Sequence, residues 1–520
     1  MKKSIISAIL LLTLVLMCGF FTGCNSDDKT STTAATTTEA TVTTTTPNNE
    51  EPEPESMKFS INGVSIKEYM IVYGEDDGYA AACFLRDEIL KATGERVATA
   101  KISAAEDNDW SYAYEIVVGC NARPDTPKCT EYYSYKVCSD NEKRITVSGY
   151  DSYALNNAAK AIVDKLVSVG GNASLKELDL SYTLPDREEY IEDIDKLYMR
   201  WIGEWQPDPE MLDYEAKLDA FKNVSDRLLT CLHRADGYYY PENSIEGIIS
   251  AYKMGTDCVE LDIQVTKDGK LILLHDSGDY SLYRMTNADE FVGKTIDGIT
   301  FPNSYNVLDW TYEQIQYLNL RDKWGYVNYG WDGPRHPVTP YKVATLEEAL
   351  KVCKNRMLII PDKTDVWTYI PEGNGRPDLF SVMQAANNYE SIIISYGADV
   401  YNASYIQSYI NAGSLVNARP LILIRDDNAD AFTYDVLDRK AEANSFGIQV
   451  GGNFYLPAPS VIESDTFSDW SKKIVLWGWT IEGNEKRIIW ETMYNAGYRM
   501  IMGNMTMDFI KYAAEVSGFN

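Results

Sequence analysis

From residue 228 to residue 520, short apolar runs alternate with amphipathic stretches. The amphipathic stretches, such as Thr345–Val352, Asp378–Asn388 and Glu485–Ala496, carry apolar side chains at helical spacing. Short continuous apolar runs are typical of strands that are buried on both faces. Their alternation with helices over roughly 250 residues predicts an α/β fold, a parallel (β/α)8 barrel of the TIM type. The nine runs are Leu228–Leu232, Val259–Val265, Leu271–Leu274, Met357–Ile360, Ile392–Ile394, Leu421–Ile424, Gly447–Val450, Ile474–Trp477 and Arg499–Met502.

Nine apolar runs are one more than an eight-stranded barrel needs. The second and third runs are separated only by a short segment that contains the turn residues Asp268 and Gly269. Because so short a spacer cannot hold a helix, these two runs predict an antiparallel hairpin outside the regular repeat. Folding the hairpin about Asp268-Gly269 places Asp262 opposite His275.

A region with a different pattern precedes the barrel. Between Phe59 and Tyr182, strand-like segments are mixed with two amphipathic helical stretches, which predicts a small α+β sandwich over residues 57–184. Its pattern resembles that of the N-terminal accessory domains of secreted bacterial carbohydrate-active enzymes. Residues 185–227 are predicted to be a charged linker with helical character. The individual predictions are strands at Ile66–Val72, Glu115–Val118, Tyr133–Cys138 and Arg144–Ser148, and helices at Tyr79–Ala92, Leu155–Val169 and Met211–Leu228.

The N-terminus has the features of an export signal. Two lysines precede the apolar run Ile5–Phe21, and small residues then lead to Gly23-Cys24. A basic start, a short apolar run and small residues are typical of a secretory signal. The Gly-Cys ending resembles a bacterial lipobox, although Phe21 replaces the usual Leu. Residues 1–24 are therefore predicted to be a lipoprotein signal with Cys24 as the lipidation site, against the alternative of a plain transmembrane anchor.

The segment that follows the signal is predicted to be a tether. Residues 25–56 are rich in Thr, Pro and Glu and have almost nothing to bury, so they cannot offset the entropy of ordering. No later run reaches the roughly 18 apolar residues that a membrane span needs. We therefore expect a protein at the bacterial cell surface, attached by lipid to the outer face of the plasma membrane.

The charge of the chain excludes one class of partner. Lys and Arg number 48 and Asp and Glu 77, which gives a formal net charge of −29. Non-specific binding of nucleic acid needs a surplus of Lys and Arg, so no nucleic-acid partner is expected.

Histidine is scarce, and its positions are informative. The chain has three, of which His233 ends the first predicted barrel strand, where side chains usually face the active site of such a barrel. Glu260 and Asp262 are two apart on the next strand, so both point to the same side. The predicted hairpin brings His275 beside them. Two carboxylates that face one way in an apolar strand repel each other unless a cation binds them.

Each of these residues has a simpler interpretation when taken alone. A buried histidine is more often a hydrogen-bonded core residue than a catalyst, and Glu-x-Asp is common on exposed strands. His336 lies in the loop-like sequence Gly333–Pro337 and is predicted to be a surface or rim residue. The combination of two histidines at strand ends with an acidic pair between them favours a functional site.

At this point the segment from about Leu232 to Asn287 resembles the glycerophosphodiester phosphodiesterase family. The order and spacing of five motifs carry the resemblance. It implies a (β/α)8 barrel that hydrolyses a phosphodiester with a divalent metal and two histidines. The motifs are His233-Arg234, Pro241-Glu242-Asn243-Ser244, Glu260-x-Asp262, Thr266-Lys267-Asp268-Gly269 and His275-Asp276.

The resemblance also implies roles for individual residues. The two histidines would be the general acid and base, because imidazole titrates near neutral pH. Oxygen ligands favour calcium or magnesium over zinc as the divalent cation. The substrate would be a small-molecule or polymer phosphodiester. The implied roles are catalysis by His233 and His275, metal binding by Glu260, Asp262 and Asp362, phosphate binding by Arg234 and Lys363, and orientation of the first histidine or the metal by Glu242 and Asn243.

The sequence departs from the family pattern at two places. The third family motif is usually Glu-x-Lys, whereas this chain has Ile360-Pro361-Asp362-Lys363. Pro361 then occupies the expected ligand position and cannot bind a metal through its side chain, so Asp362 is predicted to substitute. Ala235 also replaces the Gly that follows His-Arg in the family.

Other interpretations remain open at the level of sequence. Trp479, near the end of a late strand, is a candidate for the wall of a substrate groove, and core packing is an equally simple alternative. The substrate could instead be a phospholipid or a glycan-linked phosphodiester. A non-catalytic surface binding protein with a degenerate barrel is a third possibility, which Pro361 favours and the intact pair of histidines opposes.

Overall fold

The computed structural model describes residues 57–74, 78–102, 112–119, 123, 126–200, 205–223, 225–323, 334–362, 379–389, 391–393, 395–397, 421–424, 447–450, 474–476, 487–495, 497–504 and 506–519. The chain divides into two units, Met1–Glu55 and Ser56–Asn520, and every described residue belongs to the second. The predicted signal, Cys24 and the whole tether lie outside the described residues, as do Lys363 and Trp479. Within the described residues, no helix is long and apolar enough to cross a membrane.

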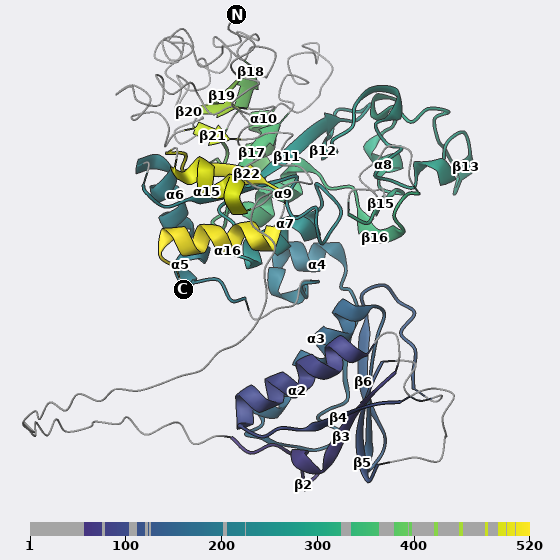
Figure 1. Ribbon diagram of the computed structural model, residues 1–520. Helices are drawn as coiled ribbons and strands as arrows, with labels where there is room; N and C mark the ends of the chain where they lie inside the picture. The colour runs from purple at the N-terminus through teal and green to yellow at the C-terminus, as the bar shows by residue number, and fades with distance from the viewer. Residues whose placement is uncertain are drawn as a thin grey trace, which may run out of the picture. The chain divides into compact units, whose positions relative to one another are not determined.

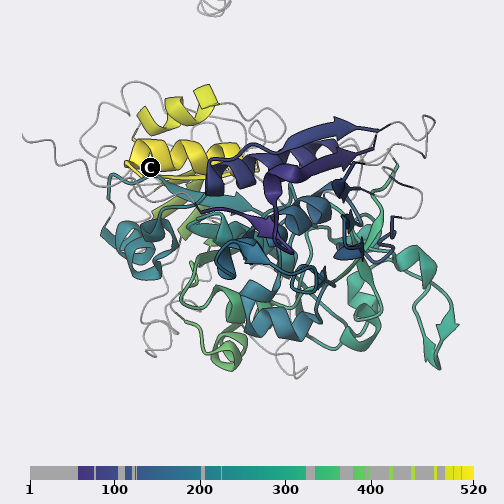
Figure 2. The same ribbon diagram turned by 90° about the horizontal axis from the view of Figure 1, so that it is seen from below.

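The N-terminal part is built on a six-stranded sheet with the strand order β4-β3-β5-β7-β6-β9. Helices α2 (Tyr79–Thr93) and α3 (Ser152–Ser168) pack against each other and against this sheet (Figures 1 and 2). The buried face of α3 carries Leu155, Ala158, Ile162 and Leu166, at the helical spacing seen in the sequence. The strands are β3 (Tyr69–Tyr73), β4 (Ala98–Lys101), β5 (Tyr114–Val118), β6 (Tyr135–Asn141), β7 (Arg144–Gly149) and β9 (Leu180–Tyr182), and a small second sheet holds β1 (Ser60–Ile61), β2 (Val64–Ser65) and β8 (Asn172–Ala173).

One predicted strand of this region is wrong in extent. The segment Ile66–Val72 begins with a single 3-10 turn, η1 (Ile66–Glu68), and the strand starts only at Tyr69. Ser65 starts the turn, because its hydroxyl accepts a hydrogen bond from the backbone N–H of Lys67. The domain limits at residues 184 and 227 stay predictions.

Four short helical elements, α4 (Arg187–Glu192), η2 (Ile194–Lys196), α5 (Pro209–Leu212) and α6 (Tyr214–Asn223), precede the barrel. The single helix expected over Met211–Leu228 is therefore wrong. The chain breaks at Asp213, whose carboxylate accepts hydrogen bonds from the backbone N–H groups of Glu215 and Ala216 and so begins a new helix.

Among the described residues, eight parallel strands form the barrel that the alternation predicted, with one of them at Ser395–Gly397 instead of Ile392–Ile394 (Figure 1). Seven parallel ladders link them, and the bridge between Ile359 and Ile392 joins β17 to the segment that leads into β18. Helices α7 (Ile245–Lys253), α9 (Leu346–Cys353), α10 (Leu379–Ala386), α15 (Arg487–Asn495) and α16 (Thr506–Ser517) are the described helices of this part. The strands, in ring order, are β10 (Leu229–His233), β11 (Cys258–Val265), β17 (Leu358–Asp362), β18 (Ser395–Gly397), β19 (Leu421–Ile424), β20 (Gly447–Val450), β21 (Ile474–Leu476) and β22 (Met500–Gly503).

The ninth strand forms the predicted hairpin, but its register differs from the expectation by one residue. Strand β12 (Leu271–Leu273) pairs antiparallel with β11, with Ile263 opposite Leu273. Consequently the backbone N–H of Leu274 bonds to the carbonyl of Asp262, and His275 follows one position later. The reason is the turn, which is centred on Asp268 rather than between Asp268 and Gly269, with Gly269 in the left-handed conformation at φ 90°.

A subdomain between β12 and β17 was not expected from the sequence. The described residues between 278 and 342 contain three 3-10 turns, helix α8 (Tyr312–Ile315) and two small antiparallel strand pairs. Phe301, Trp310 and Tyr341 are among the side chains of its own buried cluster. This subdomain begins directly after His275 and Asp276, so it stands beside the ends of the barrel strands that carry the candidate site.

Candidate active site

Alternation along the barrel strands decides which side chains face the barrel interior. On β10, β11 and β17, the residues Leu229, Cys231, Cys258, Leu358 and Ile360 form the inner cluster. Their neighbours Leu232, Val259, Leu261 and Ile359 pack in the outer core with the helices. Because successive side chains point to opposite faces of a strand, the polar residues at positions 233, 260, 262 and 362 belong to the inner set.

Three carboxylates meet at the carboxyl ends of β11 and β17. Glu260, Asp262 and Asp362 each offer an oxygen atom, and these atoms all lie within 4.8 Å of one another. In the ladder, Asp262 pairs with Asp362, whereas Pro361 pairs with Leu261. The expectation that Pro361 occupies the ligand position is therefore wrong, because the side chain at position 361 lies on the outward face of the strand and that at 362 on the inward face.

The chemistry of this group suits a divalent cation. Burial raises the pKa of Glu260 well above its usual value, and the neighbouring Asp262 and Asp362 raise it further. A bound cation with two positive charges would relieve both the burial and the repulsion, and all three donors are the hard oxygen atoms that calcium and magnesium prefer. Glu260, Asp262 and Asp362 are thus the residues that would hold a metal.

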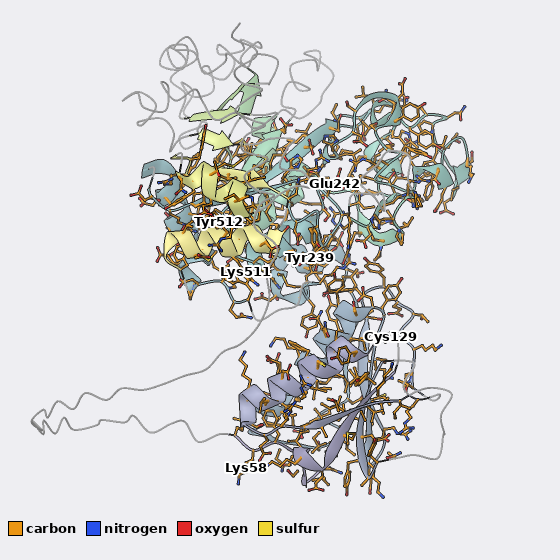
Figure 3. The ribbon with its side chains drawn as sticks, in the orientation of Figure 1. Lys58, Cys129, Tyr239, Glu242, Lys511 and Tyr512 are labelled. Carbon is orange, nitrogen blue, oxygen red and sulfur yellow. The ribbon has the colours of Figure 1, made fainter. Side chains whose placement is uncertain are left out.

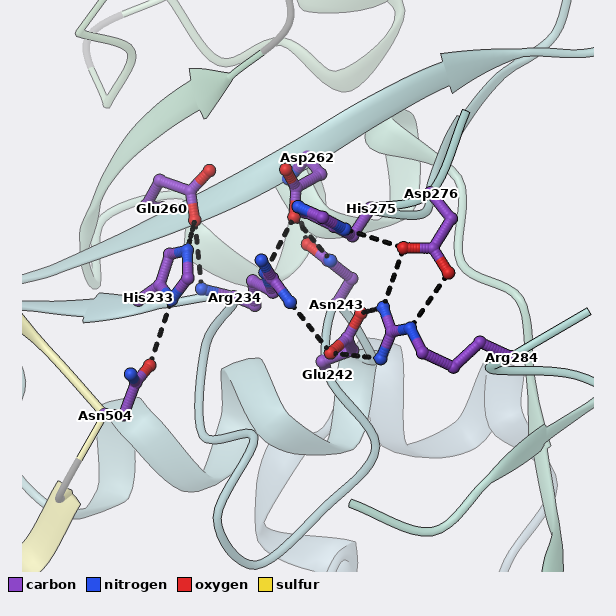
Figure 4. Close-up of polar contacts among 10 residues, drawn as sticks. All are labelled: His233, Arg234, Glu242, Asn243, Glu260, Asp262, His275, Asp276, Arg284 and Asn504. Atoms are coloured by element: carbon purple, nitrogen blue, oxygen red, sulfur yellow. Dashed lines mark hydrogen bonds and ion pairs between the residues drawn. The ribbon is translucent and has the colours of Figure 1, made fainter. Parts of the chain in front are cut away.

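His233 lies at the end of β10, next to Glu260 in the parallel ladder. Its Nδ1 donates a hydrogen bond of 3.0 Å to Oδ1 of Asn504, and its Nε2 lies 3.9 Å from a carboxylate oxygen of Glu260 (Figure 4). Burial lowers the pKa of His233 well below its usual value, with a further contribution from the Arg234 cation. In the neutral ring, donation from Nδ1 leaves the lone pair on Nε2, on the side of the carboxylates.

His275 is held in a similar manner by a different partner. Its Nδ1 lies 2.7 Å from Oδ1 of Asp276, and Asp276 in turn binds the guanidinium of Arg284 (Figure 4). Burial alone would raise the pKa of Asp276, but the hydrogen bond from His275 and the charge of Arg284 outweigh it and lower the pKa to about 2. The ring of His275 is therefore oriented by a permanently charged carboxylate.

A chain of alternating charges joins the two histidine regions. Glu242 accepts a hydrogen bond of 3.1 Å from Arg234 and also binds Arg284, which continues to Asp276 (Figure 4). Burial alone would raise the pKa of Glu242, but Arg284 and Arg234 lower it overall. Glu242 is buried and lies on the same loop as Tyr239, and Figure 3 labels both residues.

Glu242 and Asn243, the two residues predicted to orient the first histidine or the metal, have different partners in the structure. Asn243 is tied to Asp262 by two hydrogen bonds, from its side-chain amide at 3.0 Å and from the Asp262 backbone N–H at 2.9 Å. It therefore fixes one of the candidate metal ligands. Glu242 instead forms ion pairs with Arg234 and Arg284. Arg234, the predicted phosphate fork, contacts Asp262 through Nε at 3.3 Å as well as Glu242.

The loop after β10 has an unusual backbone. Arg234 and Ala235 have φ values of 57° and 61°, and Asn243 has 59°. The left-handed region is costly for residues with a Cβ. In this conformation the backbone N–H of Arg234 points at Glu260, to which it donates a hydrogen bond of 3.0 Å. A glycine at position 235, as in the family pattern, would adopt this conformation without the strain that the Cβ of Ala235 brings.

Three residues of this network, Asp276, Arg284 and Asn504, had no predicted role. Asp276 and Arg284 lie inside the recognised segment, and their pairing with His275 and Glu242 could have been suspected from their place beside the His-Asp motif. Asn504 lies 271 residues after its partner His233, at the end of β22, and only ring closure of the barrel brings them together. No sequence signal marks it. His336 is partly exposed in the described subdomain, where its backbone carbonyl accepts from Arg321.

Comparison with known proteins identifies the class. Residues 233–399 match the model of the glycerophosphoryl diester phosphodiesterase family, which agrees with the resemblance seen in the sequence. A glycerophosphodiester phosphodiesterase of Bacillus subtilis is 50% identical over 62 residues, which are 12% of this chain and 20% of that protein. One of Caldanaerobacter subterraneus is 31% identical over 120 residues, covering 20% and 48% of the two chains.

A human protein and a solved structure also match. The human protein named glycerophosphodiester phosphodiesterase 1 is 33% identical over 135 residues, which cover 26% of this chain and 33% of that one. The chain thus spans between a fifth and about half of the length of these curated relatives. A crystal structure of a glycerophosphoryl diester phosphodiesterase from Parabacteroides distasonis is 18% identical, with a TM-score of 0.40, and covers 60% of this chain and 93% of that one.

Proposed function

We propose that the protein hydrolyses a phosphodiester, a glycerophosphodiester or a related ester, with a divalent cation and two histidines. The observation that carries this proposal is the meeting of three carboxylates, within 4.8 Å of one another, with two histidines whose Nδ1 atoms each have a fixed partner. A structural role would not require such a concentration of buried acids. The family assignment of residues 233–399 supports the same activity.

The hydrogen-bond partners of the two histidine rings suggest which ring acts as the general acid and which as the general base. The partner of His275 is a carboxylate, which balances the charge of an imidazolium, so His275 is suited to donate a proton to the leaving alcohol oxygen. The partner of His233 is the neutral amide of Asn504, so His233 is suited to accept the proton of the attacking hydroxyl, from water or from the neighbouring glycerol oxygen. The new P–O bond forms as the bond to the leaving alcohol breaks.

The remaining groups bind and balance charge. The cation, calcium or magnesium, would be held by Glu260, Asp262 and Asp362 and would supply neutralisation of a non-bridging phosphate oxygen. Arg234 lies beside Asp262, and we assign it to the phosphate as well. Lys363 follows Asp362 directly and is proposed as a second phosphate contact, with Trp479 as a wall of the substrate groove.

The test of this function is release of free alcohol from glycerophosphocholine by the full chain, with and without a chelator. We expect turnover that calcium or magnesium restores after chelation, and a loss of at least about 100-fold in His233→Ala and His275→Ala. The inward position of Asp362 removes the sequence argument for a degenerate, non-catalytic barrel. If wild type and both variants are equally inert on a panel of phosphodiesters, the enzyme proposal is wrong.

We also propose that the enzyme acts at the outer face of a bacterial plasma membrane, anchored by lipid at Cys24. The basic start, the Gly23-Cys24 ending and the Thr- and Pro-rich residues 25–56 support this location. Expression of Cys24→Ala in a bacterial host tests it. We expect the wild type in the membrane fraction and the variant in the soluble or secreted fraction, and equal distributions would contradict the anchor.

A further inference from the structure

Two loops leave the candidate active site and return to it. The first runs from Arg234 to Glu242, whose side chains pair at 3.1 Å, and the second from Asp276 to Arg284, which pair at 2.8 Å. Glu242 also pairs with Arg284, so both loops stand on one continuous chain of ion pairs (Figure 4). Each loop has seven residues between its paired ends. A seven-residue segment that must return to its origin can reach only about 12 Å from its base.

Both loops expose tyrosine side chains. Tyr238 on the first loop is 37% exposed, and Tyr280 and Tyr283 on the second are 70% and 36% exposed. Among the described residues, Tyr280 is the most exposed of the large hydrophobic side chains. Exposure of several aromatic rings on fixed loops is unfavourable in water and is typical of a surface that binds something. The short reach of the loops keeps these rings next to the site.

The rings of the second loop form an ordered array rather than a random cluster. Tyr280 and Tyr283 meet edge to face, with ring centroids 6.5 Å apart and an interplanar angle of 79°. Tyr283 and Tyr305 repeat the arrangement at 5.2 Å and 82°. Tyr305 is anchored to the loop through its backbone carbonyl, which accepts from Ser281 and Leu282. The array is thus fixed by the subdomain that the sequence did not predict.

Cations of the protein already cover two of these rings. The guanidinium of Arg335 lies 4.5 Å from the centroid of Tyr283, and the ammonium of Lys323 lies 5.9 Å from that of Tyr238. Arg335 is held there by Asp289 and by the backbone carbonyl of Tyr283, both at 2.9 Å. A cationic ligand that approached either Tyr238 or Tyr283 would meet a like charge within 6 Å of the ring centre, which disfavours it.

We propose that the two tyrosine loops form the subsite for the leaving alcohol, and that this subsite selects a neutral, ring-shaped polyol such as inositol or a hexose over a quaternary ammonium alcohol. The inference rests on the proposed phosphodiesterase function and specifies its substrate class. The carbon-bound hydrogens of such a ring form an apolar face that a tyrosine can cover, while the hydroxyl groups stay in water or bind polar neighbours. The cations over Tyr238 and Tyr283 provide the selection against choline and ethanolamine.

The test compares kcat/KM for glycerophosphoinositol and glycerophosphocholine in the full chain with its cation present. We expect the wild type to favour the inositol ester by about tenfold or more, as one or two aromatic contacts would provide. In the double variant Tyr280→Ala/Tyr283→Ala, this ratio should fall towards one, mainly through a higher KM for the inositol ester. Arg335→Gln should raise kcat/KM for the choline ester by about threefold or more.

Tyr79→Ala is the matched control, since Tyr79 is 62% exposed on α2, in the N-terminal sheet region. It should leave both kcat/KM values unchanged. Turnover of both esters without preference, or an equal loss for both in the double variant, would overturn the alcohol subsite while leaving the phosphodiesterase function intact. No turnover of either ester would overturn the function itself, and the subsite with it.

Discussion

Asp362 lies directly across the parallel ladder from Asp262, and both face the interior of the barrel. The pair explains how a chain with proline at position 361 can still offer three carboxylates to a cation. The position of the ligand is set by the alternation of the strand and not by alignment of a short motif. Because Asp362 faces inward and Pro361 faces outward, substitutions at these two adjacent positions form a test and its control.

Asp362→Asn should weaken binding of calcium or magnesium by at least about tenfold, because it removes one charged donor of three. Isothermal titration of the metal-free protein measures this affinity directly. Pro361→Ala, on the outward face, should leave it unchanged. Equal affinities of wild type and Asp362→Asn would remove Asp362 from the site.

The guanidinium of Arg284 pairs with Glu242, where the first loop ends, and with Asp276, where the second loop begins. Arg284→Met leaves Glu242 and Asp276 buried with fewer partners, so the free energy of unfolding should fall by about 3–5 kcal/mol. Urea unfolding measures the change. Arg487→Met, which breaks the exposed pair with Glu515, should leave the free energy of unfolding nearly unchanged and serves as the control. Similar losses in both variants would show that the Arg284 network contributes no more than a surface ion pair.

Asn504 is a positioning residue for His233. Asn504→Leu removes the acceptor for Nδ1, so the ring loses its fixed orientation and tautomer, and kcat should fall about 10- to 100-fold. Asn504→Asp keeps an acceptor oxygen and should recover part of the activity. It should also shift the pH dependence of kcat to higher pH, because a carboxylate favours the charged imidazole. A purely structural role would give neither the partial rescue nor the shift.

The strained backbone at Ala235 predicts an unusual response to glycine. Ala235→Gly relieves a left-handed φ of 61°, which offsets the lost methyl burial and the added entropy of the unfolded chain, so the cost should stay below about 1 kcal/mol. Ala251→Gly, in the buried helix α7, has no strain to relieve and should cost about 2 kcal/mol. Equal costs in urea unfolding would argue against strain at position 235.

Lys217 should make stability depend on pH. It is buried on α6, where its ammonium donates to the carbonyls of Thr256 and Arg356, and burial lowers its pKa from 10.5 to about 8. Between pH 8 and 10.5 the unfolded chain keeps a proton that the folded protein has lost, so the free energy of unfolding rises with pH in this window. Below pH 8 both states are protonated and the cost of burying the charge remains.

The comparison of wild type with Lys217→Met isolates this effect. The difference in the free energy of unfolding, wild type minus variant, should increase by about 3 kcal/mol between pH 7.5 and 10.5. Other titrating groups contribute equally to both proteins and cancel. A difference that stays constant over this range would show that the pKa of Lys217 is not lowered.

The sequence by itself predicted the alternation of strands and helices that is typical of a parallel barrel, and the hairpin that supplies the ninth strand. Both follow from local periodicity, which a strand buried on two faces must show whatever surrounds it. It also predicted the members of the candidate site, because His233, Glu260, Asp262 and His275 lie at strand ends within one short segment. Cys24, Lys363 and Trp479 lie outside the described residues, and their roles stay predictions.

Only the tertiary structure decided how these groups are held. Asn504 reaches His233 because the last strand of the ring closes on the first, and Arg284 reaches Glu242 because a subdomain returns to the site. The register of the hairpin and the inward position of Asp362 depend on turn geometry and strand pairing, which a one-residue shift would reverse. Contacts between residues far apart in the chain are set by the packing of the whole barrel, and no local pattern encodes them.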